Sequence, residues 1–341
     1  MNLENETEKQ PQPVPSKYNA SLRARLLPAV IIILGLIGFF CLRILTDYAF
    51  DVLIGSLMIL GALEVENLLR KMDRPTVLFV VGGYPILSFI LTIIAVNLGF
   101  NILNYLLITL ITLLSIFILM FAIPMIFTKY TSKAMARDEY HGKMVVYSMS
   151  KSLNTIFVCI WPCLLFSFAF MINHFEALQV ALNSYIVAYQ ATTDIGLLGL
   201  LLLFVTTMFA DTCAMFTGKL IKSPKISLTK LGPGKSWSGL VGGILGASLG
   251  AIILFVIFNS FTGYNSLFSA IGINVWSFLL AGLFCGGMSM LGDILASLFK
   301  RRAVVKDFSQ LIPGHGGIMD RINGLVFNSV AVYTVLCILF A

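Results

Sequence analysis

Charged residues are scarce in this chain of 341 amino acids, at 11%, whereas hydrophobic residues make up 58%. Together with a mean hydropathy of +0.93, this excludes an ordinary soluble domain. The sequence also lacks a P-loop and a GxGxxG turn preceded by a strand, which excludes the common soluble nucleotide-binding folds. Because there is no soluble basic domain, the net charge of +7 does not indicate nucleic-acid binding.

Cysteine residues, histidine residues and targeting signals give little indication of the protein's function. All six cysteines fall in apolar segments, and the pair Cys159 and Cys163 has no matching Cys/His pair, so we predict structural roles. Zinc is disfavoured because only His315 lies near the charged part of the chain. No secretory signal peptide is evident, so we expect the first apolar run to be a retained helix.

Apolar runs long enough to cross about 30 Å of hydrocarbon are abundant. They lie at 26–46, 50–69, 77–98, 102–127, 154–174, 196–218, 238–260, 267–297 and 324–341. We therefore predict an all-α polytopic membrane protein with about nine transmembrane helices.

The distribution of Lys and Arg predicts the orientation. If the N-terminus is cytoplasmic, nine spans place 1–25, 70–76, 128–153, 219–237 and 298–323 on one side, and these segments hold 22 of the 23 basic residues. The remaining one is Arg43. By the positive-inside rule, these segments face the cytoplasm and its anionic membrane lipids.

We divide the chain by composition into three parts. Residues 1–25 are polar and predict a disordered cytoplasmic tail, 26–174 form N-terminal transmembrane helices, and 175–341 form a C-terminal catalytic domain with cytoplasmic loops 219–237 and 298–323. The short C-terminus and the lack of a targeting sequence favour a bacterial plasma membrane.

The segment 297–323 concentrates polar residues beside apolar helices. Its cations Lys300, Arg301, Lys306 and Arg321 suit phosphoryl oxygens, whereas Asp307 and Asp320 are hard ligands of the kind Mg²⁺ takes beside phosphates. The sequence His315-Gly316-Gly317 predicts a tight turn that lets backbone approach a ligand. A bilayer protein keeps such a cluster where something anionic is handled.

Carboxylates within the predicted spans are the second signal, because they are costly in a membrane. Asp293 lies two turns before Lys300, in a helix whose Gly282, Gly286 and Gly287 predict close helix approach, and a metal or phosphate site is favoured over a local ion pair. For Asp211 a structural carboxylate is an open alternative.

Glu64 and Glu66 lie at the end of the second predicted span. They point to different helix faces, and Glu66 is predicted to pair with Arg70 at i+4. In loop 219–237, Lys235 beside a helix start suits phosphate binding. Together these residues predict metal-assisted phosphoryl or nucleotidyl transfer, with a lipid as the second substrate.

Four motifs carry a family resemblance. They are Ser297-x-x-Lys300-Arg301 with Lys306-Asp307 and Ile312-Pro313-x-His315-Gly316-Gly317-x-x-Asp320-Arg321, then Asp211-Thr212 through Gly218-Lys219, Lys235-Ser236-Trp237-x-Gly239, and Leu291-Gly292-Asp293. This set resembles the phosphatidate cytidylyltransferase family, also called CDP-diacylglycerol synthases. The resemblance covers the C-terminal 140 residues well and the N-terminal half by hydropathy only.

The resemblance implies that CTP and phosphatidate give CDP-diacylglycerol and pyrophosphate, with Mg²⁺ and a monovalent cation such as K⁺. It implies metal binding by Asp293 and Asp320, with Lys306 and Arg321 also catalytic. It further implies nucleotide or phosphate contacts by Lys235, Lys300, Arg301, His315, Gly316, Gly317 and Asp211, and a homodimer.

Departures from the family pattern bear on metal affinity and rate. Asn323 and Ser238 stand where the family has carboxylates, Cys213 stands where it has glycine, and Gly234 replaces a lysine. Two alternatives stay open: a CTP-dependent lipid kinase of the polyprenol or phytol type, and a secondary transporter that uses the in-span carboxylates as coupling sites. The HGG-x-x-DR signature favours the cytidylyltransferase, and the lack of an inverted repeat disfavours the transporter.

Overall fold

A computed structural model describes residues 22–43, 45–99, 102–131, 137–179, 192–221, 223–224, 236–312 and 316–340. The side chains of 22–29, 32–33, 102, 123–131, 137–145 and 178–179 lie outside this description. So do the first 21 residues of the predicted tail and two predicted site residues, Lys235 and His315.

Regular structure in the described residues is helical. The helices are α1 (Leu22–Arg43), α2 (Asp47–Lys71), α3 (Leu78–Asn97), α4 (Ile102–Thr131), α5 (Arg137–Val158), α6 (Leu165–Asn173), α7 (Phe175–Gln179), α9 (Ile195–Leu220), α10 (Trp237–Asn259), α11 (Thr262–Ile271), α12 (Val275–Arg302) and α13 (Met319–Phe340). A π-helical segment, Cys159–Leu164, joins α5 to α6. In the described part of the chain, eight helical segments are long and apolar enough to cross a membrane. The prediction of an all-α polytopic membrane protein is confirmed.

These eight segments coincide with the second to ninth predicted spans. The first predicted span, 26–46, overlaps α1. Within α1, the segment Leu34–Arg43 is apolar, and all of its side chains are described. The predicted start of the eighth span at 267 is wrong. Gly272 adopts a left-handed φ of 74° and ends α11, and Asn274 then caps α12 with its side chain.

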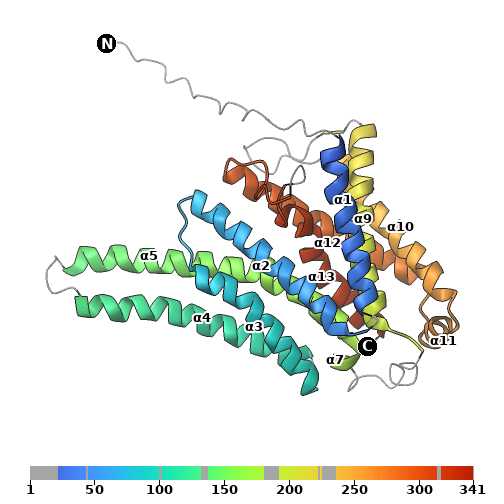
Figure 1. The fold of residues 1–341 in the computed structure, drawn as a ribbon, viewed down its shortest axis with the longest axis horizontal. Coiled ribbons are helices and arrows are strands. Elements are labelled where there is room, and N and C mark those ends of the chain that lie inside the picture. Colours follow the sequence, from blue (N-terminus) through green and yellow to red (C-terminus); the bar gives the residue numbers. More distant parts are fainter. Residues whose placement is uncertain are drawn as a thin grey trace, which may run out of the picture.

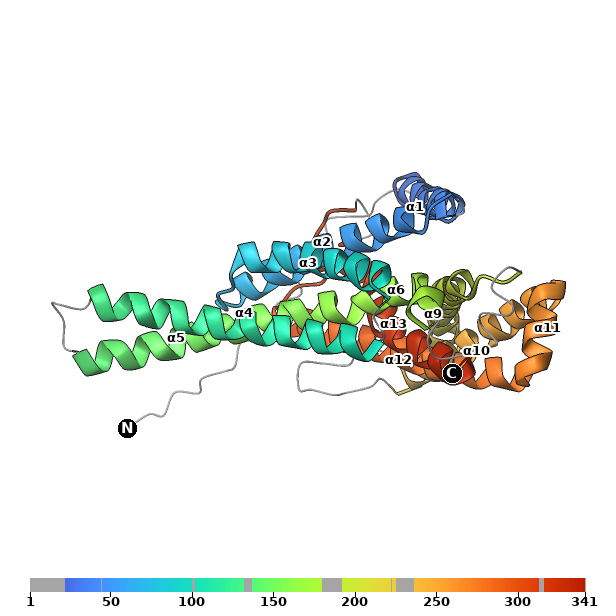
Figure 2. The same ribbon diagram turned by 90° about the horizontal axis from the view of Figure 1, so that it is seen from below.

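The helices form an elongated molecule (Figure 1, Figure 2). The α4–α5 hairpin lies at one end of its long axis, and α10 and α11 lie at the other. Helices α9, α10, α12 and α13 pack in series, and α13 also packs on α6.

Glycines permit the close approach of α12 to α10. A Cβ atom built at Gly282 would lie 2.5 Å from the Cα of Ser248, and one at Gly286 would lie 2.7 Å from the Cβ of Ala247. These two predicted contacts are confirmed. The same prediction for Gly287 is wrong, because a Cβ there would have no heavy atom within 4 Å.

The helices define two ends of the membrane-spanning body. Helices α2, α9 and α12 finish, and α10 and α13 begin, at what we call the loop end; contacts such as Lys300 to Asp320 join these termini. The opposite end, where α1 finishes and α2 and α9 begin, we call the far end.

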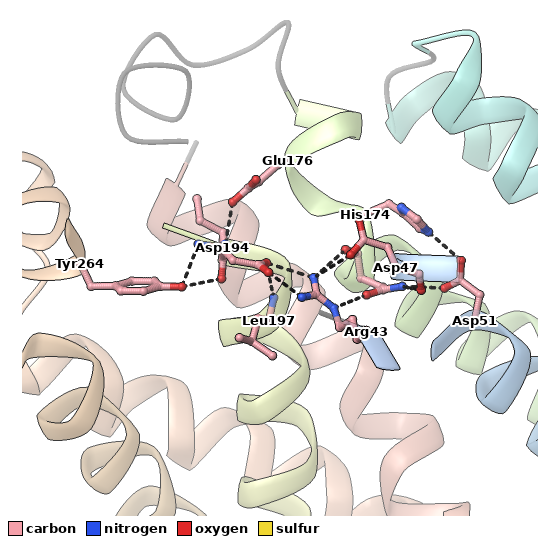
Figure 3. A network of polar contacts seen from close by, with 10 residues as sticks. Arg43, Asp47, Asp51, His174, Glu176, Asp194, Leu197 and Tyr264 are labelled. Carbon is pink, nitrogen blue, oxygen red and sulfur yellow. Dashed lines mark hydrogen bonds and ion pairs between the residues drawn. The ribbon is translucent and has the colours of Figure 1, made fainter. Parts of the chain in front are cut away.

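Arg43 organises the far end (Figure 3). Its guanidinium donates to both carboxylate oxygens of Asp194 at the start of α9, at 2.5 and 3.0 Å, and to the Asn173 side chain of α6 at 2.7 Å. Asn173 in turn donates to buried Asp51, which also contacts His174 at 2.6 Å. The network therefore fixes α1, α2, α6 and α9 to one another, and it accounts for the single basic residue predicted on this side.

The ion pair is asymmetric in burial, and this predicts unequal mutant effects. The Arg43 side chain is 5% exposed, whereas that of Asp194 is 45% exposed and borders a cavity of about 180 Å³. Asp194→Asn keeps the helix-capping oxygen that accepts from the Leu197 N–H, but it leaves the buried guanidinium with the more distant Asp47 carboxylate, at 3.8 Å, so we expect a loss of about 2–3 kcal/mol. Arg43→Gln leaves a carboxylate that water can reach, and should cost about 1 kcal/mol.

Thermal unfolding in detergent, followed by circular dichroism, measures both variants against the parent. An equal decrease in the midpoint would show that the buried guanidinium does not dominate the energetics of this network.

Candidate active site

Asp320 stands at the centre of the loop end, in the first turn of α13. One of its oxygens, Oδ1, accepts from the Lys300 ammonium of α12 at 2.6 Å. The other, Oδ2, accepts the backbone N–H groups of Phe308 at 2.9 Å and Gly317 at 3.0 Å. A helix N-terminus favours a carboxylate, so Asp320 is held by charge and by hydrogen bonds at once. The structure therefore brings together the predicted residues Lys300, Gly317 and Asp320.

The predicted loop 298–323 is shorter in the structure, because α12 continues to Arg302 and α13 begins at Met319. Lys300 and Arg301 consequently lie on the last turn of α12, where cations suit the helix C-terminus. Phe308 anchors the loop: its ring is 2% exposed, lies against Trp161 and has the Lys300 ammonium 5.6 Å from its centroid.

Gly316 is required where it stands. Its φ of 82° is left-handed, and an added Cβ would lie 3.0 Å from Asp320 Oδ2. The Ile312 N–H donates to its carbonyl at 2.9 Å, which closes the tip of the loop. The backbone at this glycine therefore lies close to Asp320, whereas its predicted approach to a ligand stays a prediction.

Glu64 of α2 reaches the same loop from the N-terminal half of the chain. Its carboxylate accepts from the Ser309 hydroxyl at 2.6 Å and from the N–H groups of Ile318 and Met319 at 2.9 and 2.7 Å. Sequence reasoning marked Glu64 only as an in-span carboxylate and assigned it no role. Its neighbour Glu66 contacts Arg70 and Thr76 instead, so the predicted ion pair and the divergence of the two carboxylates are confirmed.

Three helices meet just below this loop. A Cβ at Gly324 of α13 would lie 2.7 Å from Ser289 Oγ of α12 and 3.0 Å from Thr207 Cγ2 of α9. A Cβ at Gly292 would lie 2.5 Å from the carbonyl oxygen of Asn323, so α12 and α13 touch almost backbone to backbone. The positions of these helices are therefore fixed close to the candidate site.

The residues that meet here are Thr207, Ser289 and Gly324, one from each helix. Four residues from each of them, toward the loop end, the same helix carries a carboxylate. These carboxylates are Asp211 on α9, Asp293 on α12 and Asp320 on α13. Residues four apart share a helix face, so the three carboxylates come from three helices at one level. Asp211 is exposed, and Asp293 is half-buried.

The oxygen donors at this level fit a magnesium ion that is shared with substrate phosphates. Mg²⁺ is usually held by one or two carboxylates plus phosphate oxygens, and Asp320 Oδ1 keeps a lone pair beyond its bond to Lys300. One turn further along α13, the buried Oδ1 atom of Asn323 has no hydrogen-bond partner among the described residues. Within the described chain, no three Asp, Glu, His or Cys side chains gather as a ready metal site.

Comparison with known proteins bears on what such a site serves. A model of the cytidylyltransferase family matches residues 23–339. The chain belongs to this family. It is 41% identical over 130 residues to the phosphatidate cytidylyltransferase of Haemophilus influenzae, covering 38% of this chain and 42% of that relative.

Two further relatives are similar in the same way. The phosphatidate cytidylyltransferase of Rickettsia conorii is 36% identical over 135 residues, 39% of this chain and 56% of that one. The chloroplastic phosphatidate cytidylyltransferase 4 of Arabidopsis thaliana is 32% identical over 146 residues, 42% and 34% of the two chains. The chain thus spans between 34% and 56% of these relatives' lengths.

The remaining cations differ in how they are placed. Lys306 and Arg321 are exposed, and Arg301 is half-buried. Lys300, predicted to contact phosphate, has its ammonium beside Asp320. In this cytidylyltransferase-family chain, Lys300 is therefore the predicted phosphate-binding cation that contacts Asp320 directly.

Two departures from the family pattern have structural contacts. Ser238 donates to the Ile221 carbonyl at 3.0 Å and contacts Ser223, and so joins the two ends of loop 219–237. Cys213 lies where α9 crosses α10. A Cβ atom built at Gly246 of α10 would lie 2.5 Å from the Cβ atom of Cys213.

Proposed function

We propose that the chain transfers a cytidylyl group from CTP to phosphatidate, giving CDP-diacylglycerol and pyrophosphate for phospholipid synthesis. The observation that carries this proposal is the setting of Asp320. It lies between Lys300 and two backbone N–H groups, under a basic loop, at the end of apolar helices that also carry Asp211 and Asp293. Family membership and the names of the relatives support it.

In this reaction an oxygen of the phosphatidate phosphate attacks the α-phosphorus of CTP, and the bond to the pyrophosphate oxygen breaks. The attacking group is already anionic, so the protein needs no nucleophile of its own and mainly positions charge. Lys306, Arg321 and Arg301 would bind phosphoryl oxygens, while Lys300 keeps Asp320 in place. Lys235 and His315 remain predicted contacts to the nucleotide.

A divalent cation fits this scheme. Asp293 and Asp320 would hold Mg²⁺, which when bound neutralises the charge of the phosphates. Asp211 stands at the same level, and Asn323 would contribute a neutral oxygen where the family pattern has a charged one. A monovalent cation such as K⁺ stays a prediction from the resemblance.

The position of the site suits one lipid and one water-soluble substrate. The helices that end at the loop end are apolar along their length, so a lipid can remain in the bilayer while its phosphate reaches the exposed cations. We propose that this end faces the cytoplasm of a bacterial plasma membrane, since the predicted cytoplasmic segments hold nearly all the Lys and Arg. The predicted homodimer is retained as part of the proposal.

Purified protein in detergent with Mg²⁺, phosphatidate and CTP labelled at the α-phosphate tests the function. Label should appear in a lipid extract as CDP-diacylglycerol, with one pyrophosphate released per lipid formed, and chelation of Mg²⁺ should stop both. Diacylglycerol in place of phosphatidate is the negative control. Absence of pyrophosphate release would overturn the proposal, and release of CDP with transfer of the γ-phosphate to a lipid alcohol would identify a kinase instead.

A further inference from the structure

Helix α13 begins without a cap of its own. Its first backbone hydrogen bonds run from Arg321 and Ile322 to the carbonyl of Ile318, which puts Ile318 at the capping position. An isoleucine side chain cannot accept a hydrogen bond, so the N–H groups at this helix start need an acceptor from elsewhere.

Glu64 supplies that acceptor from a position 254 residues away in the chain. Its two oxygens accept from the Ile318 and Met319 N–H groups and from the Ser309 hydroxyl, and the residue is 5% exposed. A Cβ at Gly317 would lie 2.5 Å from Glu64 Oε2, so the contact requires glycine at that position.

The same few residues also hold Asp320. Gly317 donates its N–H to Asp320 Oδ2. The next two residues in the chain, Ile318 and Met319, donate their N–H groups to Glu64. Phe308, which makes the other backbone contact to Asp320, directly precedes Ser309. Glu64 and Asp320 therefore hold the same two short segments of backbone, 308–309 and 317–319.

We propose that Glu64 is a positioning residue, whose carboxylate occupies the anion-binding N-terminus of α13 and thereby keeps residues 305–309 and 316–319 in the arrangement that presents Asp320. This inference rests on the proposed function. Because Glu64 fills the place where a helix would otherwise bind a phosphate, the substrate phosphates bind side-chain cations instead. Glu64 acts through the backbone and is not a general base, since both its oxygens accept hydrogen bonds and the attacking phosphate carries no proton that must be removed.

Glu64→Gln tests the proposal, because its amide would direct an NH₂ group at a backbone N–H. Glu66→Gln is the matched control: it makes the same change, two residues away on the same helix, at a carboxylate that is 1% exposed but contacts Arg70 and Thr76. If only about one molecule in ten of Glu64→Gln holds the productive arrangement, the KM for CTP rises about tenfold while kcat at saturating CTP stays within about threefold.

Hydrogen exchange followed by mass spectrometry gives a readout that is independent of activity. Peptides containing Phe308 and Met319 should exchange at least about tenfold faster in Glu64→Gln than in the parent, and those from α10 should not change. Glu66→Gln should leave the exchange at Phe308 and Met319 as in the parent. This arm reports on the contact even if the parent protein makes no CDP-diacylglycerol.

A fall in kcat at saturating CTP without faster exchange would overturn the proposal and place Glu64 in the chemistry. Unchanged exchange together with unchanged KM would also overturn it. If Glu64→Gln does not fold, Ser309→Ala removes one of the three bonds and should cause a smaller change of the same kind in both measurements. An unaltered Ser309→Ala protein would then count against the proposal.

Discussion

Replacing Asp320 by Asn is expected to lower the rate of the proposed reaction, CDP-diacylglycerol formation, by about 10²–10³-fold, the range seen when one preorganised polar group is removed from a site. The amide would present an NH₂ group either to the Lys300 ammonium or to the N–H groups of Phe308 and Gly317, all of which are donors. It would also remove half of the predicted pair of anionic magnesium ligands. Steady-state assays over a range of Mg²⁺ concentrations measure the loss.

Asp73→Asn is the control for this change. Asp73 also lies at the loop end but is exposed, and its φ of 54° is a left-handed conformation that Asn accepts. Its activity should stay within about twofold of the parent, as is usual for an exposed site. If Asp320→Asn retained full activity, both the metal assignment and the central place of Asp320 would be wrong.

The sequence predicts the fold well because bilayer spans depend on a simple physical property. An apolar run must be long enough to cross the hydrocarbon, and charges must remain outside it. Boundaries are harder. The predicted span 267–297 missed the break at Gly272, because a left-handed glycine and a capping Asn hardly alter hydropathy. The sequence predicts Lys300 and Arg301 in a loop because they are charged. In the structure they lie in the last turn of α12, where cations are stable.

The candidate site is predicted in composition but not in its internal contacts. Motif spacing places Lys300, Gly317 and Asp320 in one segment, and the structure joins them. The contacts of Glu64 could not be found in this way, because its partners lie 245 to 255 residues away and no local pattern links them. Arg43 likewise pairs with a residue 151 positions away. Such contacts follow from helix packing, which a single sequence does not specify residue by residue.

Gly292→Ala is expected to lower activity by about 10²-fold through helix packing alone. The added methyl group would lie 2.5 Å from the Asn323 carbonyl oxygen, a backbone atom that can move only with α13 itself. The displacement would separate Asp293 from Asp320, which flank this crossing, and a misplacement of about 1 Å can cost about 10²-fold in rate. Overpacking should also lower the free energy of unfolding by about 1–3 kcal/mol.

Gly287→Ala makes the same substitution five residues earlier on α12, where a Cβ meets no heavy atom within 4 Å. Alanine is the better helix former by about 1 kcal/mol, so this variant should be as stable as the parent or more so, with unchanged turnover. Thermal unfolding midpoints, measured side by side, should therefore move in opposite directions in the two variants, whereas initial rates should fall only in Gly292→Ala. An active Gly292→Ala protein would mean that the crossing tolerates a wider separation, and that Asp293 and Asp320 need not be held at a fixed distance.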